Sequence, residues 1–449
     1  MKKLSAMITA LTTGAAFTGC TFGASIDTLM APPKLGPEQE QIYSELTRSL
    51  GTSNISLKYP KSGKYLSAFI IEDIDGDGGN EAIVFYEKNN HAADENPLRI
   101  NVLDQENGQW MSASDRGAVG SEIEEVIISK LGSNDRVNLI IGTSLINRSE
   151  KNVSVYTYSN GVLQEPPTFS RNKAYAYIDV MDLDLDGENE LLRITGASGD
   201  DQAMAEVFRL DEDGQYNRSN TALSDNISDF DISYGKVGDS KVGIYIDALS
   251  GTGSVQTDVL YLDGNALHKV FRTAEETEKT MRASGCTCFD IDGDGSIEIP
   301  LQKLAPGYKE SEGGDYLMLT DWNRISDDDK LKKCFTSYYS VNDGYIFLFP
   351  EKWEEKVTVK RAADEEIVFC TFTTNENEVV MGRELLSICR IEGTLDSNEV
   401  KEKIGAGYMP MHTKGDSTYL ANVSLTEDAS GDGLSITMGE AAAGFRFRD

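Results

Sequence analysis

Histidine, tryptophan and cysteine are scarce in this chain of 449 residues, which has three, three and six of them. The histidines His91, His268 and His412 lie in polar or turn-like stretches. The sequence contains no HExxH, GxSxG, P-loop or Rossmann pattern, so it indicates none of those enzyme classes. The five cysteines after Cys20 form no CxxC pair, and their odd number leaves at least one thiol unpaired. A disulfide framework is therefore not expected.

Positive charge is also in short supply. The chain has 42 lysines and arginines against 74 aspartates and glutamates, which gives a net charge of −32. Nucleic acid is excluded as a partner because no basic stripe is present to neutralise phosphates. Electrostatic adhesion to an anionic membrane surface is disfavoured for the same reason. An acidic excess of this size is consistent with solubility and with cation binding.

Long hydrophobic runs are absent apart from residues 4–17, which follow Lys2 and Lys3 and are too few to span a bilayer. The end of the run overlaps the motif "FTGC" at residues 17–20, which resembles the lipobox of bacterial lipoproteins. Phe17 stands where leucine is usual in that motif. This resemblance implies a signal peptide at residues 1–19 and lipidation of Cys20. We therefore expect an extracytoplasmic protein that is anchored to the bacterial cell membrane only through its lipid.

Glycine and aspartate, by contrast, are concentrated in three short loops. The motifs "DIDGDGGNE", "DLDLDGENE" and "DIDGDGSIE" begin at Asp73, Asp182 and Asp290, which are 109 and 108 residues apart. Two hairpin patterns without the carboxylates, at residues 126–144 and 231–249, lie midway between them. A second type of hairpin has turn glycines 53, 53 and 50 residues apart, at Gly108, Gly161, Gly214 and Gly264. The sequence therefore predicts a repeat of about 54 residues with four strands.

A repeated four-stranded unit of this length is typical of a β-propeller blade. Five repeats begin near residues 65, 122, 174, 229 and 283, and Pro300 interrupts a strand of the fifth. We expect a mainly β protein: a β-propeller of about five to six four-stranded blades at residues 61–341, preceded by a tether and short helix at residues 20–60. A small α+β domain is expected at residues 342–449, where the frame "YIFLFPEKW … LLSICRI" resembles PsbP-like domains.

The acidic loops have the composition of a calcium site. Counted from the first aspartate, carboxylates fall at positions 1, 3, 5 and 9, glycine stands at position 6, and a backbone carbonyl is available at position 7. Oxygen ligands without histidine or cysteine favour Ca²⁺ over zinc or copper. An acidic turn without a metal is the alternative, which repulsion among four carboxylates disfavours. The predicted ligands are Asp73, Asp75, Asp77, Gly79 and Glu81; Asp182, Asp184, Asp186, Glu188 and Glu190; and Asp290, Asp292, Asp294, Ser296 and Glu298.

An EF-hand is excluded because position 12 is Val84, Arg193 or Leu301 where that motif needs glutamate. The pattern D-h-D-x-D-G-x-x-E followed by a strand resembles the FG-GAP or VCBS-type repeat of calcium-binding β-propellers, over about residues 65–303. The resemblance implies Ca²⁺ in the hairpin loop between the first two strands of a blade. Lys130 and Lys236 stand near position 1 of the two intervening hairpins, so no metal is predicted there.

Two classes of function follow. The first is a non-enzymatic lipoprotein whose calcium-stabilised propeller binds a protein or glycan at the cell surface. The second is a cell-surface polysaccharide hydrolase or lyase that uses the propeller as a scaffold. The 74 acidic residues make carboxylate pairs inevitable, so the sequence alone singles out no catalytic pair.

Overall fold

The computed structural model describes residues 35–448, with gaps at residues 90–96, 147–149, 170–172, 198–201, 225–226, 251–252, 311–315, 363–365, 376–377 and 424–430. The signal peptide at residues 1–19 and the lipidation site Cys20 lie outside the described residues. No helix in the described part of the chain is long and apolar enough to cross a membrane.

The described chain begins with one amphipathic helix, α2 (Pro37–Leu50). Proline is favoured in the first helical turn because its missing N–H has no partner there. The helix ends at Gly51, which adopts φ 67°, a left-handed conformation open to glycine without strain. Its side chains Ile42 and Leu46 are fully buried against the first sheet. The helix therefore covers one face of that sheet.

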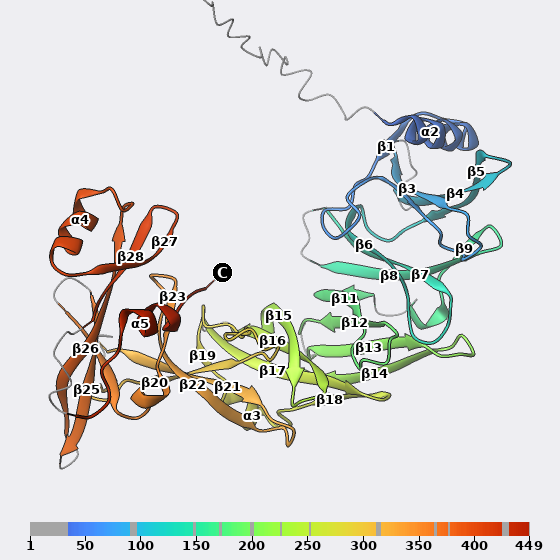
Figure 1. The fold of residues 1–449 in the computed structure, drawn as a ribbon. Helices are drawn as coiled ribbons and strands as arrows, with labels where there is room; N and C mark the ends of the chain where they lie inside the picture. Colours follow the sequence, from blue (N-terminus) through green and yellow to red (C-terminus); the bar gives the residue numbers. More distant parts are fainter. Residues whose placement is uncertain are drawn as a thin grey trace, which may run out of the picture.

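The molecule is mainly β, as predicted, and is built from antiparallel sheets (Figure 1). Sheet 1 contains β1 (Ile55–Leu57), β2 (Phe69–Glu72), β3 (Glu81–Lys88), β4 (Leu98–Glu106) and β5 (Gln109–Gly117). Sheet 2 contains β6 (Glu122–Lys130), β7 (Val137–Ser144), β8 (Lys151–Ser159), β9 (Val162–Gln164) and β10 (Ala174–Tyr175), with the short helix η1 (Pro167–Phe169) after β9. Sheet 3 contains β11 (Tyr177–Met181), β12 (Glu190–Thr195), β13 (Met204–Leu210) and β14 (Tyr216–Ala222).

Sheet 4 contains β15 (Ile227–Val237), β16 (Lys241–Ser250), β17 (Ser254–Asp263), β18 (Ala266–Lys269) and β19 (Arg282–Ala283), and α3 (Ala274–Glu278) lies between its last two strands. The first four sheets each contain a meander of four consecutive strands: β2–β5, β6–β9, β11–β14 and β15–β18. The four turn glycines Gly108, Gly161, Gly214 and Gly264 all have positive φ and lie between the third and fourth strands of these meanders.

Sheet 5 combines consecutive strands with one from the end of the chain. Its order is β20 (Ile299–Leu304), β21 (Met318–Ile325), β22 (Leu331–Ser340), β23 (Tyr345–Leu348) and β29 (Phe445–Phe447). Pro300 lies in β20, an edge strand, which is where a sheet tolerates proline. Strands β23 and β29, both within residues 342–449, thus complete a sheet that begins before residue 342.

Sheet 6 has the order β24 (Val357–Arg361), β25 (Ile367–Asn375), β26 (Glu378–Glu392), β28 (Ser417–Val423) and β27 (Met409–Lys414). The helices η2 (Glu351–Trp353), α4 (Asn398–Gly405) and α5 (Met438–Gly444) accompany it. Strands and helices are therefore mixed in this part of the chain. Its likeness to PsbP-like domains stays a prediction.

Apolar clusters join each sheet to its neighbours in the order of the chain. One joins sheets 1 and 2, and others join sheets 2 and 3, 3 and 4, 4 and 5, and 5 and 6. Within the described residues no cluster joins sheet 1 to sheet 5, and Figure 1 shows the sheets along an open arc with α2 at one end and sheet 6 at the other. The number of propeller blades and the closure of a ring stay predictions.

Candidate metal centres

The three acidic loops lead directly into β3 of sheet 1, β12 of sheet 3 and β20 of sheet 5. We call residues 73–81, 182–190 and 290–298 sites 1, 2 and 3. In sites 1 and 2 the loop connects paired strands, and in site 3 the pair Phe289 and Glu298 closes it. The residue at position 2 of each loop points into the core: Ile74, Leu183 and Ile291 are 2%, 0% and 4% exposed. These apolar side chains anchor each loop to its sheet.

Backbone N–H groups hold the carboxylates in the same arrangement in all three sites. The N–H of position 2 donates to the glutamate at position 9, at 2.8, 2.9 and 3.1 Å. The glycine N–H of position 6 donates to the aspartate at position 1, at 3.1, 2.9 and 2.8 Å. The N–H of position 7 donates to the aspartate at position 5, at 2.7, 2.8 and 2.7 Å. The loop geometry is therefore one motif built three times.

Carboxylate oxygens from different positions converge in each loop and could hold a metal ion. In each loop, three acidic side chains form a triad in which one oxygen of each lies within 4.8 Å of one oxygen of the other two. The triads are Asp73, Asp75 and Glu81; Asp182, Asp184 and Glu190; and Asp290, Asp292 and Asp294. The predicted ligands Asp77, Asp186 and Glu298 are not members of these triads. The carbonyl positions Gly79, Glu188 and Ser296 are held in the same loops through their N–H groups.

The position 9 glutamates are buried charges. Glu81, Glu190 and Glu298 are 1%, 0% and 1% exposed. Burial, reinforced by the neighbouring aspartates and opposed by the hydrogen bond from position 2, raises the pKa of each to about 7. A proton and a cation thus compete for the same oxygens.

Site 2 supplies a direct test of whether a cation fits. The oxygens Asp182 Oδ1, Asp184 Oδ1 and Glu190 Oε1 are buried and have no hydrogen-bond partner among the described residues. Buried carboxylate oxygens are normally paired or bound to a metal, because an uncompensated charge in the interior is costly. The donor set, made only of carboxylates and backbone carbonyls, suits a hard divalent cation.

The two hairpins without carboxylates use their lysines in other ways. Lys130 Nζ lies 2.7 Å from Asp135 Oδ1 in its own turn, and Lys236 Nζ donates to the carbonyl oxygen of Asp294 at 2.5 Å. Groups of three acidic side chains with metal-binding spacing occur, within the described ranges, only in sites 1 to 3.

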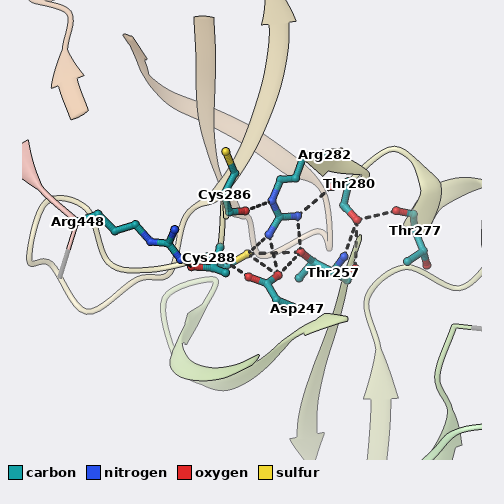
Figure 2. Close-up of polar contacts among 9 residues, drawn as sticks. Asp247, Thr257, Thr277, Thr280, Arg282, Cys286, Cys288 and Arg448 are labelled. Atoms are coloured by element: carbon teal, nitrogen blue, oxygen red, sulfur yellow. Dashed lines mark hydrogen bonds and ion pairs between the residues drawn. The ribbon is translucent and has the colours of Figure 1, made fainter. Parts of the chain in front are cut away.

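A buried polar junction between sheet 4 and the segment that leads into site 3 was not predicted from the sequence (Figure 2). Arg282, fully buried, donates from Nη2 to Asp247 Oδ1 at 2.7 Å and from Nη1 to Thr257 Oγ1 at 2.7 Å. Its Nε donates to the carbonyl of Cys286, and the N–H of Cys288 donates to Asp247 Oδ2 at 2.5 Å. One signal in the sequence was available: Asp247 interrupts the apolar run "VGIYIDAL".

Cys286 and Cys288 are two residues apart, a spacing that predicts one shared face if the segment is a strand. That prediction is wrong, because residues 286–288 form no strand and the two side chains enter different apolar clusters. Both are buried and neither forms a disulfide. Burial raises the pKa of the Cys288 thiol, so the group packs as a neutral side chain.

The cavities lie away from the acidic loops. A cavity of about 660 Å³ lies between the edges of sheets 3 and 4, next to α3, and its lining includes His268, Lys269 and Arg272. A second, of about 370 Å³, lies between sheets 5 and 6, beside Tyr338 and Arg390. No residue of sites 1 to 3 lines either cavity.

No family model and no curated protein matches this chain. Among solved structures, a polysaccharide lyase, Uly1, is 13% identical and is matched over 82% of this chain and 92% of its own, with a TM-score of 0.26. A thermostable family-43 glycoside hydrolase is 10% identical over 73% and 97%, with a TM-score of 0.24. The lectin of Aleuria aurantia is 8% identical over 72% and 97%, with a TM-score of 0.23. At these TM-scores the likenesses assign no activity to this chain.

Proposed function

We propose that this protein is a non-enzymatic, extracytoplasmic lipoprotein whose stack of β-sheets is stabilised by Ca²⁺ and binds a protein or glycan at the cell surface. One observation carries the proposal: the same carboxylate loop stands at the same place in sheets 1, 3 and 5, anchored in the core and apart from the cavities. A loop repeated in every second sheet is typical of a structural metal site, whereas an enzyme usually has a single catalytic site.

Calcium is the cation that the donor set favours. Each loop offers carboxylates at positions 1, 3, 5 and 9 and a carbonyl at position 7, without nitrogen or sulfur ligands. Ca²⁺ accepts six to eight such oxygens in flexible geometry, whereas Mg²⁺ usually keeps several waters and is held by one or two carboxylates. A bound cation would stabilise the loop and neutralise the buried glutamate at position 9.

The described histidines support a role other than catalysis. His268 stacks on Tyr261 and His412 stacks on Phe445, with ring centroids 5.2 and 5.0 Å apart. The first pair lies within sheet 4 and the second joins sheet 6 to sheet 5, so both rings contribute to packing. The lipid anchor at Cys20 would keep the sheets at the outer face of the cell membrane, where protein and glycan partners are available.

The experiment joins a stability measurement to a binding measurement. The purified chain is melted in chelator and in millimolar Ca²⁺, and its binding to a glycan array and to a panel of surface proteins is compared under both conditions. We expect a higher melting temperature with Ca²⁺ and binding without turnover of the bound glycan. An unchanged melting temperature would overturn the calcium assignment, and release of shortened or unsaturated sugars would establish the hydrolase or lyase alternative.

A further inference from the structure

The three acidic sites share their ligand pattern but differ in the residue that lies opposite the position 9 glutamate. In sheet 1, Ala82 pairs with Leu103, so the next residues in register are Glu81 and Asp104. In sheet 3, Leu191 pairs with Phe208, which places Arg209 opposite Glu190. In sheet 5, Ile299 pairs with Asn323, which places Arg324 opposite Glu298. One structural position therefore holds an acid in site 1 and an arginine in sites 2 and 3.

These cross-strand residues act on the ligand carboxylates. Arg209 Nη1 lies 3.5 Å from Asp184 Oδ2, and the two side chains are 21% and 10% exposed. Arg324 and Asp104 hold the same cross-strand position in sites 3 and 1, where their charges have opposite signs. Counting positions 1, 3, 5 and 9 and the residue opposite position 9, site 1 thus has five carboxylates, whereas sites 2 and 3 each have four and a guanidinium.

Two further side chains separate site 2 from site 3. Lys236, from β15 of sheet 4, donates its N–H to the carbonyl of Gly295 at 2.9 Å and its Nζ to the carbonyl of Asp294 at 2.5 Å. Site 3 therefore has a second cation at its ligand loop. In site 2, the half-buried Glu188 at position 7 adds an acidic side chain beside Asp186 and partly offsets Arg209.

We infer that the residue opposite the position 9 glutamate sets the affinity of each loop for a divalent cation, so that site 1 binds most tightly, site 2 less tightly and site 3 least. The inference rests on the proposed function, in which the loops bind a divalent cation. Like charge near a bound cation weakens binding and opposite charge strengthens it, with an energy that grows as the environment becomes less polar. In sites 2 and 3 the arginine also neutralises the carboxylates when no metal is bound, so these loops depend less on the ion.

The test is a calorimetric titration of the full chain with Ca²⁺ after removal of divalent cations by chelator. We expect one site to bind about 10-fold or more tightly than the other two, since a nearby unit charge changes binding by roughly this factor or more. Asp104→Asn should weaken the tight phase alone, while Arg209→Gln and Arg324→Gln should each strengthen one weaker phase. Asp263→Asn is the matched control, because Asp263 lies opposite Lys241 at the equivalent place of sheet 4, which has no acidic loop.

Thermal melting in chelator shows whether each variant is folded, and the inference also predicts the direction in which each melting temperature changes. Without metal, Asp104→Asn should melt higher than the unmodified chain, and Arg209→Gln and Arg324→Gln should melt lower. Three sites of equal affinity, or a tight phase that Asp104→Asn leaves unchanged, would overturn the inference. Absence of any Ca²⁺ binding would overturn the proposed calcium function, an outcome distinct from binding without a ranking.

Discussion

At the scale of the residue, the position 9 glutamate links the metal loop to the sheet. In site 2, Glu190 Oε2 accepts the N–H of Leu183 at 2.9 Å, while Oε1 is buried without a partner among the described residues. One carboxylate oxygen thus holds the loop and the other is left for a ligand. A substitution that keeps the hydrogen bond from Leu183 but removes the charge that would bind a cation tests metal binding without disturbing the structure of the loop.

Glu190→Gln makes that separation. The amide oxygen can still accept the N–H of Leu183, but the charge is gone. We expect the calcium-dependent rise in melting temperature to shrink, because a ligand at 100 times its Kd stabilises a protein by about 2.7 kcal/mol per site. In chelator the variant should be as stable as the unmodified chain or more stable, since a buried uncompensated charge is removed. Thermal melting with and without Ca²⁺ measures both effects.

Glu188→Gln is the control for that variant. The residue occupies position 7 of the same loop, where only its backbone carbonyl is expected to bind the ion. Because Glu188 is a neighbouring charge and not a side-chain ligand, its replacement should reduce the calcium-dependent stabilisation much less than Glu190→Gln does. Equal responses to Ca²⁺ in Glu190→Gln and the unmodified chain would show that Glu190 is not a ligand.

The buried pair of Asp247 and Arg282 gives a second prediction at this scale. Arg282→Met leaves the Asp247 carboxylate without its cation in the interior, and removal of one member of a buried ion pair typically costs about 3 to 5 kcal/mol. Urea unfolding should show this loss of stability. The double variant Asp247→Leu with Arg282→Met should recover much of it, because no isolated charge is then buried. A single variant within about 0.5 kcal/mol of the unmodified chain would contradict the structural role of the pair.

At the scale of the element, the turns of the two hairpins without carboxylates dock onto the next sheet. The N–H of Gly132, in the turn after β6, donates to the carbonyl of Asn189 in site 2 at 2.8 Å. The N–H of Gly238, in the turn after β15, donates to the carbonyl of Ile325 in sheet 5 at 3.1 Å. Sheets 2 and 3 are joined in this way, and so are sheets 4 and 5. The two hairpins without carboxylates therefore form contacts between neighbouring sheets.

Gly132→Ala tests this docking. Gly132 has φ 68°, and a Cβ built there would lie 2.1 Å from the carbonyl oxygen of Leu210. Gly161, with φ 76°, has no atom within 4 Å of such a Cβ and is the matched control. Gly161→Ala should cost about 1 kcal/mol of conformational strain. Gly132→Ala should cost about 1 to 3 kcal/mol more, because the added methyl group presses on fixed backbone. Urea unfolding of both variants measures the difference, and equal losses would argue against the docking.

The sequence predicted the elements better than their partners. The Asp-Gly and Asn-Gly turns and the alternating strands are local signals, so the hairpins around Gly108 and Gly161 and the inward-pointing Ile74 were predictable. The partners of Arg282 lie as far away as Asp247, 35 residues earlier, and no local pattern connects them. Strand β29 joins sheet 5 about 100 residues after β23, which spacing along the chain could not reveal. All the ligands of the metal sites stay predictions, because carboxylate oxygens that converge do not identify a bound ion.

At the scale of the whole molecule, both ends of the stack are covered. The face of sheet 1 that does not meet sheet 2 packs against α2, through residues that include Ile42, Leu46 and Tyr86. Sheet 5 shares an apolar cluster with sheet 6, which includes Phe347, Trp353 and Phe369. Ring closure of a propeller requires the first and last blades to offer apolar faces to each other. Here those faces are already buried against other elements.

We therefore expect an open arc in solution, which small-angle X-ray scattering of a chain starting at residue 35 can measure. A compact domain of this length has a radius of gyration of about 22 Å, and the arc in Figure 1 should exceed it. Measurements in chelator and in Ca²⁺ should give the same overall dimensions, because each ion binds within a single loop of one sheet. A radius near the compact value would show that the first and last sheets meet and would favour the closed propeller.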